Sequence, residues 1–148
     1  RCVLHTHMPF ATALTSLEDP RLHMINQNCV RFHDRIVYDG AYNGLALDND
    51  EGNRIAAALG ERDVMFMGNH GVLVVGQSLA NAWDDLYYLE RACENQVLAM
   101  STGLPLREIP SQLVHATKNQ ILGTGAYGES HLSAIQQVLD KEEPDYRS

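Results

Sequence analysis

The sequence has few cysteines, no long apolar run and no excess of basic residues. Its three cysteines, Cys2, Cys29 and Cys93, are odd in number and far apart, which does not fit a disulfide framework. Each lies among apolar neighbours, so we predict small buried side chains rather than nucleophiles. With 11 Lys and Arg against 19 Asp and Glu, the formal net charge is −8. This acidic balance argues against nucleic acid or an anionic membrane as the main partner.

Two kinds of targeting segment are also missing. No apolar run approaches the length of a membrane span, and the first residues do not resemble a signal peptide, so we expect a cytoplasmic protein. The chain opens directly on a strand-like run, without an initiator Met, a helix or a cap before it. We therefore expect it to be the later part of a longer domain. Its 148 residues, 45% of them hydrophobic, are enough for one domain with a real core.

Two histidines lie in the apolar run at residues 2–7. Residues i and i+2 of a strand project to the same face, so His5 and His7 should stand side by side. His70, between two apolar runs, is the best candidate for a third ligand. Three neutral histidines with an open coordination position are typical of catalytic zinc sites. Because the chain has seven histidines, a chance pair of ordinary polar residues is the alternative.

The remaining histidines have no partner at chelating spacing along the sequence. We expect surface or capping roles for His23, His33, His115 and His131. Asn69 immediately precedes His70, and two roles are open for it. It either orients the imidazole or serves the turn between the two apolar runs.

Apolar periodicity predicts strands at 2–7, 35–38, 64–67 and 72–75, and helices at 10–17, 48–59 and 79–100. The helix over 48–59 should begin at Asp48 as its N-cap, bury Ile55, Ala56 and Leu59, and end at Gly60. Unbroken apolar strands are usually buried on both faces. We therefore expect helices on both sides of the sheet.

The longest predicted helix begins after Ser78, its N-cap, and ends near Met100. Its apolar stripe, including Leu79 and Trp83, should pack on the sheet. Its charged residues, which include Asp84, Asp85, Glu90, Arg91 and Glu94, should form a solvated face. From residue 111 the chain is mostly helical and polar, with a glycine-rich link at 123–128 that lacks the phosphate-loop pattern.

Two blocks taken together resemble the class II aldolase/adducin family. One is His-Thr-His at residues 5–7, followed by Pro9 and an alanine-rich helix; the other is Asn-His-Gly-Val at 69–72, followed by a long helix. The family includes fuculose-phosphate and rhamnulose-phosphate aldolases, ribulose-phosphate 4-epimerase, decarboxylases and the adducin head domain. The resemblance covers residues 1–105 and implies a three-layer α/β/α sandwich on a mixed β-sheet. Residues 106–148 are interpreted as a helical C-terminal extension of the same domain.

The same resemblance implies roles for individual residues. His5, His7 and His70 fall on the zinc-binding histidines of the family, so Zn²⁺, or another divalent metal such as Mn²⁺, is the implied cofactor. Tyr127 lies near the position of a tyrosine that several members donate across a subunit boundary as an acid or base. The alternative for Tyr127 is a packing role. The family's catalytic acidic residue and its glycine-rich substrate loop would lie upstream of residue 1.

The implied function is that of a divalent-metal-dependent lyase, of aldolase or decarboxylase type, in carbohydrate metabolism. Such an enzyme stabilises the enediolate of a small hydroxy-carbonyl or sugar-phosphate-like substrate. A sugar-phosphate 4-epimerase is one alternative, and a non-catalytic assembly domain like the adducin head is another. Enzyme-type members are commonly four-fold symmetric, so the resemblance implies a homotetramer. The substrate and the native metal stay open at this point.

Overall fold

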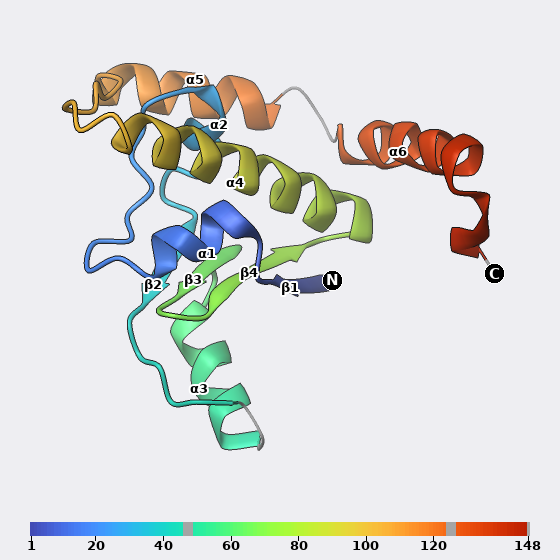
Figure 1. The fold of residues 1–148 in the computed structure, drawn as a ribbon, viewed down its shortest axis with the longest axis horizontal. Coiled ribbons are helices and arrows are strands. Elements are labelled where there is room, and N and C mark those ends of the chain that lie inside the picture. The colour runs from blue at the N-terminus through green and yellow to red at the C-terminus, as the bar shows by residue number, and fades with distance from the viewer. Residues whose placement is uncertain (46–48, 124–126, 148) are drawn as a thin grey trace.

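A mixed β-sheet lies at the centre of the fold (Figure 1). The computed structural model describes residues 1–45, 49–123 and 127–147. In this part of the chain, four strands lie in the order β1-β4-β3-β2. Strand β4 pairs antiparallel with both β1 and β3, whereas β2 runs parallel to β3. The four predicted strands are confirmed, with bounds β1 (Cys2–Thr6), β2 (Ile36–Asp39), β3 (Val64–Met67) and β4 (Gly71–Gly76).

Helices lie on both sides of this sheet, which confirms the predicted α/β fold class (Figure 1). Helices α1 and α4 cover one face, α3 lies on the other side beside β2, and α6 projects beyond the start of α4. Among the described residues, no helix is both long and apolar enough to cross a bilayer. The helices are α1 (Pro9–Thr15), α2 (Gln27–Val30), α3 (Asn49–Leu59), α4 (Leu79–Met100), α5 (Ser111–Gly123), α6 (Gly128–Glu142) and the 3₁₀ helix η1 (Pro144–Arg147).

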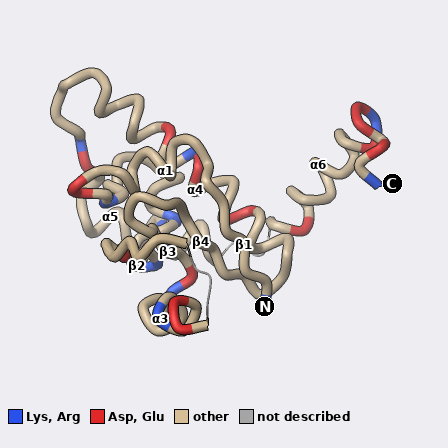
Figure 2. The backbone as a smooth tube through the Cα atoms, turned by 60° about the horizontal axis from the view of Figure 1, so that its bottom comes forward, with Lys and Arg blue, Asp and Glu red and all other residues tan. Residues whose placement is uncertain are grey.

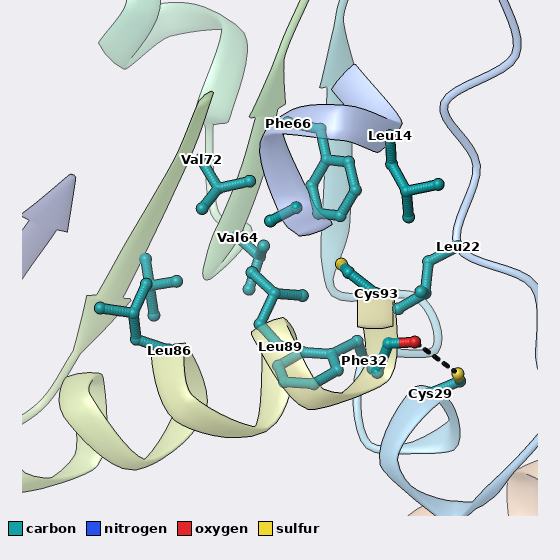
Figure 3. Packing of buried hydrophobic residues seen from close by; sticks show 13 residues of the cluster. Leu14, Leu22, Cys29, Phe32, Val64, Phe66, Val72, Leu86, Leu89 and Cys93 are labelled. Atoms are coloured by element: carbon teal, nitrogen blue, oxygen red, sulfur yellow. Dashed lines mark hydrogen bonds between the residues drawn. The ribbon is translucent and has the colours of Figure 1, made fainter. Parts of the chain in front are cut away.

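The hydrophobic core lies between the sheet and helices α1 and α4 (Figure 3). Alternate residues of β3 and β4 point into it, because successive side chains of a strand face opposite sides. Cys29 and Cys93 are buried here as predicted, and their burial raises the pKa of Cys29 to about 11 and also raises the pKa of Cys93. Neither thiol is therefore an activated nucleophile. Further members of the core are Leu14, Phe32, Val64, Phe66, Val72, Val74, Leu86 and Leu89.

Helix α4 departs from its prediction in where its charges lie. Ser78 caps it as expected, accepting a hydrogen bond from the Asn81 N–H. However, Asp84, Asp85 and Glu90 are only 3%, 6% and 7% exposed, so the predicted solvated face is wrong for these three residues. The helical period could not indicate this, because their partners come from elements far away in the sequence.

Two arginines of the segment after α2 neutralise the buried aspartates. Arg31 Nε donates to Asp85 Oδ1 at 2.7 Å, and its Nη2 donates to Asp84. Arg35 Nη2 donates to Asp85 Oδ2 at 2.6 Å, while its Nε reaches Asp63 at 2.9 Å. Buried carboxylates need such partners, since an unpaired buried charge is strongly destabilising. The network ties the segment after α2 to α4.

The apolar stripe of α4 also differs from expectation at its first turns. Leu79 is 54% exposed. The Trp83 ring lies against α6 rather than on the sheet, with its centroid 4.4 Å from that of His131. His131 in turn makes a hydrogen bond with Asp84 at 2.6 Å, so it joins α6 to α4. Part of the glycine-rich link, residues 124–126, lies outside the described residues.

Helix α3 packs more loosely than its sequence suggests. It ends before Gly60, whose φ of +57° is the left-handed conformation expected of a C-terminal glycine. None of its described residues is buried; Ile55 and Leu59 are partly covered and Ala56 is exposed, so the predicted buried face is wrong. Polar contacts hold it instead, since Arg54 pairs with Asp39 of β2 at 2.8 Å. Figure 2 shows acidic and basic residues side by side on α3. Its predicted N-cap, Asp48, lies outside the described residues.

Candidate metal centre

Three histidine rings converge at one end of the β1/β4 pair. The alternation of β1 buries part of Leu4 against the core and leaves His5 and His7 exposed on the opposite face. His70 lies in the turn between β3 and β4, directly before Gly71, which pairs with β3 at the end of the ladder. The ring centroids are 4.9 Å apart for His5–His7, 4.8 Å for His5–His70 and 4.9 Å for His7–His70. The structure thus brings together the three predicted ligands.

The hydrogen bond of His5 determines which of its nitrogens is available. Its Nδ1 lies 3.0 Å from the Val72 carbonyl oxygen. A carbonyl can only accept, so Nδ1 carries the proton and Nε2 presents its lone pair. This Nε2 lies 3.1 Å from His7 Nε2. Two nitrogens bound to one tetrahedral zinc lie about 3.3 Å apart. The pair is therefore spaced as two ligands of one ion, and the backbone of β4 orients the first of them.

The surroundings of the third imidazole, His70, favour the neutral form that a metal requires. Partial burial, together with the neighbouring His5 and His7, lowers the pKa of His70 below its ordinary value. A histidine binds a metal only when neutral, so this shift favours binding over protonation. One ligand atom from each of the three residues lies within 4.8 Å of the others. The donor set and its spacing fit a divalent metal ion, and the exposure of His5 and His7 leaves one side open to solvent.

The turn that carries His70 is fixed by backbone hydrogen bonds. The Gly68 N–H donates to the Asp39 carbonyl at 2.7 Å, and the Asn69 N–H donates to the Thr15 carbonyl at 2.9 Å. Asn69 has a φ of +54°, in the left-handed region that asparagine tolerates better than most residues. Of the two roles open for Asn69, the turn role is the one observed. The turn is thereby attached to the ends of both β2 and α1.

A close approach of β1 to β4 makes Gly71 indispensable to this geometry. A Cβ atom at Gly71 would lie 2.5 Å from the Thr6 carbonyl oxygen and 2.7 Å from His7 Cδ2. Both distances are well below van der Waals contact, so any side chain here must push β1 and the His7 ring away. Glycine at this position thus lets two ligands lie next to each other.

We expect Gly71→Ala to lower the free energy of unfolding by about 1–3 kcal/mol, as overpacking does, and to weaken zinc binding by roughly tenfold or more. Urea denaturation and zinc titration would measure the two effects. Gly52→Ala in α3 is the matched control, because a Cβ there has no neighbour within 4 Å. In that variant the free energy of unfolding should rise by about 0.5–1 kcal/mol, and the zinc affinity should not change. Unchanged zinc affinity in Gly71→Ala would contradict the role of this glycine.

Sequence reasoning missed Glu90 as a support of the site. Its two carboxylate oxygens accept hydrogen bonds from the Phe10 and Ala11 N–H groups, each at 2.9 Å. These are N–H groups of the first turn of α1, which no residue within the helix satisfies. Because α1 begins two residues after His7, Glu90 fixes the direction in which the chain leaves the histidine strand. The helical pattern had placed Glu90 with the charged residues of the predicted solvated face, so it gave no signal of this role.

Tyr127 does not join the histidines within one chain. It is 62% exposed and lines a cavity of about 1120 Å³ together with Arg1 and Gly76, at the opposite end of the β1/β4 ladder from the turn that carries His70. A different tyrosine approaches the centre, since the Tyr42 ring centroid lies 6.5 Å from that of His70. Tyr42 follows β2 and could not be placed beside the turn from sequence spacing.

The model of the class II aldolase and adducin N-terminal domain matches residues 1–97, which contain all three converging histidines. The chain belongs to this family. The expected resemblance is therefore confirmed.

Individual relatives agree with this assignment. A Pseudomonas aeruginosa protein whose name places it in aldolase class 2 is 35% identical over 99% of this chain and 58% of its own length. The decarboxylase NovR of Streptomyces niveus is 31% identical over 95% of this chain and 53% of its own. An aldolase II superfamily protein from Pseudomonas syringae has a similar structure, with a TM-score of 0.87, 36% identity, and coverage of 99% of this chain and 59% of that one. The chain thus spans just over half the length of each of these three relatives.

Proposed function

We propose that this chain provides the metal centre of a divalent-metal-dependent lyase of aldolase or decarboxylase type, which acts on a small hydroxy-carbonyl or sugar-phosphate-like substrate. The observation that carries the proposal is the convergence of His5, His7 and His70, with His5 Nε2 unprotonated and 3.1 Å from His7 Nε2. Membership of a family with both aldolase-named and decarboxylase-named members supports it. Decarboxylation and retro-aldol cleavage both leave a carbanion that needs the same stabilisation.

His5, His7 and His70 would hold the metal. When bound, the ion would act as a Lewis acid that stabilises the negative charge of an enediolate. Zinc suits three imidazoles and an open position, and manganese is the alternative. The Val72 carbonyl keeps the His5 ring in place, and the bonds of the 68–69 turn do the same for His70. Preorganised ligands of this kind need no rearrangement when the substrate arrives.

A proton donor or acceptor is also needed, and we assign this role to Tyr127 of another copy of the chain. Within one chain Tyr127 lies at the far end of the β1/β4 ladder from the His70 turn, so it would have to serve a neighbouring centre. The residue is 62% exposed and therefore accessible to such a neighbour. The proposal thus includes a homo-oligomer, and four-fold symmetry is the arrangement we favour.

Removal of the metal should abolish turnover, because the negative charge that develops at the reacting carbon would lose its main stabilisation. The test uses the longest form of the protein that includes this chain, assayed against a panel of phosphorylated and unphosphorylated hydroxy-ketones and hydroxy acids. Cleavage and release of carbon dioxide are both recorded. We expect activity to disappear after dialysis against a chelator and to return with added Zn²⁺ or Mn²⁺.

Retained activity in the chelated protein would rule out the metal-dependent lyase. Stoichiometric metal without turnover on any member of the panel would favour a non-catalytic assembly domain, in line with the adducin part of the family. Inversion of a carbinol carbon without bond cleavage between carbons would favour the epimerase.

A further inference from the structure

A second group of potential metal ligands lies apart from the three-histidine centre. His33, in the segment after α2, and His115, on α5, approach each other although 82 positions separate them in the sequence. Their ring centroids are 4.8 Å apart at an interplanar angle of 78°. The His5–His7 pair of the candidate metal centre has nearly the same geometry, 4.9 Å and 78°. Two imidazoles from separate elements thus adopt an arrangement that the chain also uses for its proposed ligands.

A carboxylate completes this second group. Asp34 Oδ2 lies 3.2 Å from His33 Nε2. The residue has a φ of +59°, a left-handed conformation that costs free energy for any residue with a side chain. The Arg62 guanidinium holds this backbone in place by donating to the Asp34 carbonyl. One ligand atom each from His33, Asp34 and His115 lies within 4.8 Å of the other two.

The other histidines outside the first centre are already satisfied. His23 makes a hydrogen bond with Glu108 at 2.5 Å, and His131 makes one with Asp84 at 2.6 Å. By contrast, in the described ranges neither ring nitrogen of His115 has a hydrogen-bond partner, and its ring contacts that of His33. The nitrogens of His115 are therefore available to a ligand.

We propose that His33, Asp34 and His115 form a second site for a divalent transition-metal ion of the zinc type. Two imidazoles and one carboxylate are a donor set that zinc binds in proteins, with water able to fill a fourth position. The exposure of Asp34 and His115 gives the ion access from solvent. The site joins α5, in the C-terminal helical part, to the segment that carries Arg31 and Arg35. Its bound ion fixes α5 to the rest of the domain.

Zinc titration of the metal-free chain by calorimetry tests this site independently of the first. We expect two zinc ions per chain for the unmodified protein and one each for His115→Ala and His70→Ala. In the variant that carries both substitutions, the zinc affinity should fall at least 100-fold. His23→Ala is the matched control, since it removes a histidine outside both groups and should leave two ions bound.

Thermal unfolding supplies a second readout, because a ligand that binds only the folded state raises the melting temperature. Zinc should raise the melting temperature of His70→Ala and leave that of the double variant unchanged. If His115→Ala lost a zinc ion and His70→Ala lost none, the result would support this site and count against the proposed function. An unchanged number of ions and unchanged affinity in His115→Ala would overturn the second site.

Discussion

Alanine in place of His70 is expected to reduce zinc affinity at the three-histidine centre by roughly 100- to 1000-fold, because one of only three protein ligands is removed. His70 is only partly buried, so the fold should persist. Catalytic activity should be lost together with the metal. Competition with a fluorescent zinc chelator would measure the affinity, and far-UV circular dichroism would confirm that the variant is folded.

The matched control is again His23→Ala, whose ring belongs to a hydrogen bond with Glu108 rather than to the centre. This variant should retain affinity and activity. If His70→Ala kept the zinc affinity of the unmodified chain at this centre, His70 would not be a ligand.

Glu90→Ala should lower the free energy of unfolding by about 3–5 kcal/mol. Each charge-assisted hydrogen bond contributes about 1.5–3 kcal/mol, and the Glu90 carboxylate accepts two from the first turn of α1. Its removal leaves the Phe10 and Ala11 N–H groups without an acceptor in a region that excludes water. The negative charge of the carboxylate also interacts favourably with the positive end of the α1 dipole. Urea denaturation would measure the loss.

Two further variants of α4 make this prediction specific. Glu90→Gln keeps one oxygen acceptor without the charge, so it should lower the free energy of unfolding by less than Glu90→Ala does. Glu94→Ala removes a partly exposed ion pair with Arg91, 2.9 Å long and one helical turn apart, and should cost only about 0.2–0.5 kcal/mol. Equal effects of Glu90→Ala and Glu94→Ala would show that the Glu90 cap has no special part in holding α1.

Local features of the fold were predictable because local rules determine them. The spacing of His5 and His7 is enough to place both imidazoles on one face of a strand, whatever surrounds it. Ser78 and Gly60 mark helix ends through interactions with their own neighbours, and the structure has both ends as predicted. The place of His70 between two apolar runs made it the best candidate for a third ligand, and the family resemblance then strengthened that choice.

Features that depend on distant partners were not predictable from periodicity. The pattern of α4 places Asp85 with the polar residues, but Arg31 and Arg35 cover it after folding. His33 and His115 illustrate the same limit, since only the packing of α5 against the segment after α2 brings their rings together. A single sequence carries no measure of such pairings. The role of Tyr127 depends on another copy of the chain and stays a prediction.

The most direct test of the central claim is a crystal structure of the zinc-loaded protein with anomalous data on both sides of the zinc absorption edge. We predict a strong zinc-specific peak about 2.0–2.1 Å from one ring nitrogen each of His5, His7 and His70, with Nε2 as the ligating atom of His5. A map of crystals grown with excess zinc that has no peak among these three rings would contradict the metal centre.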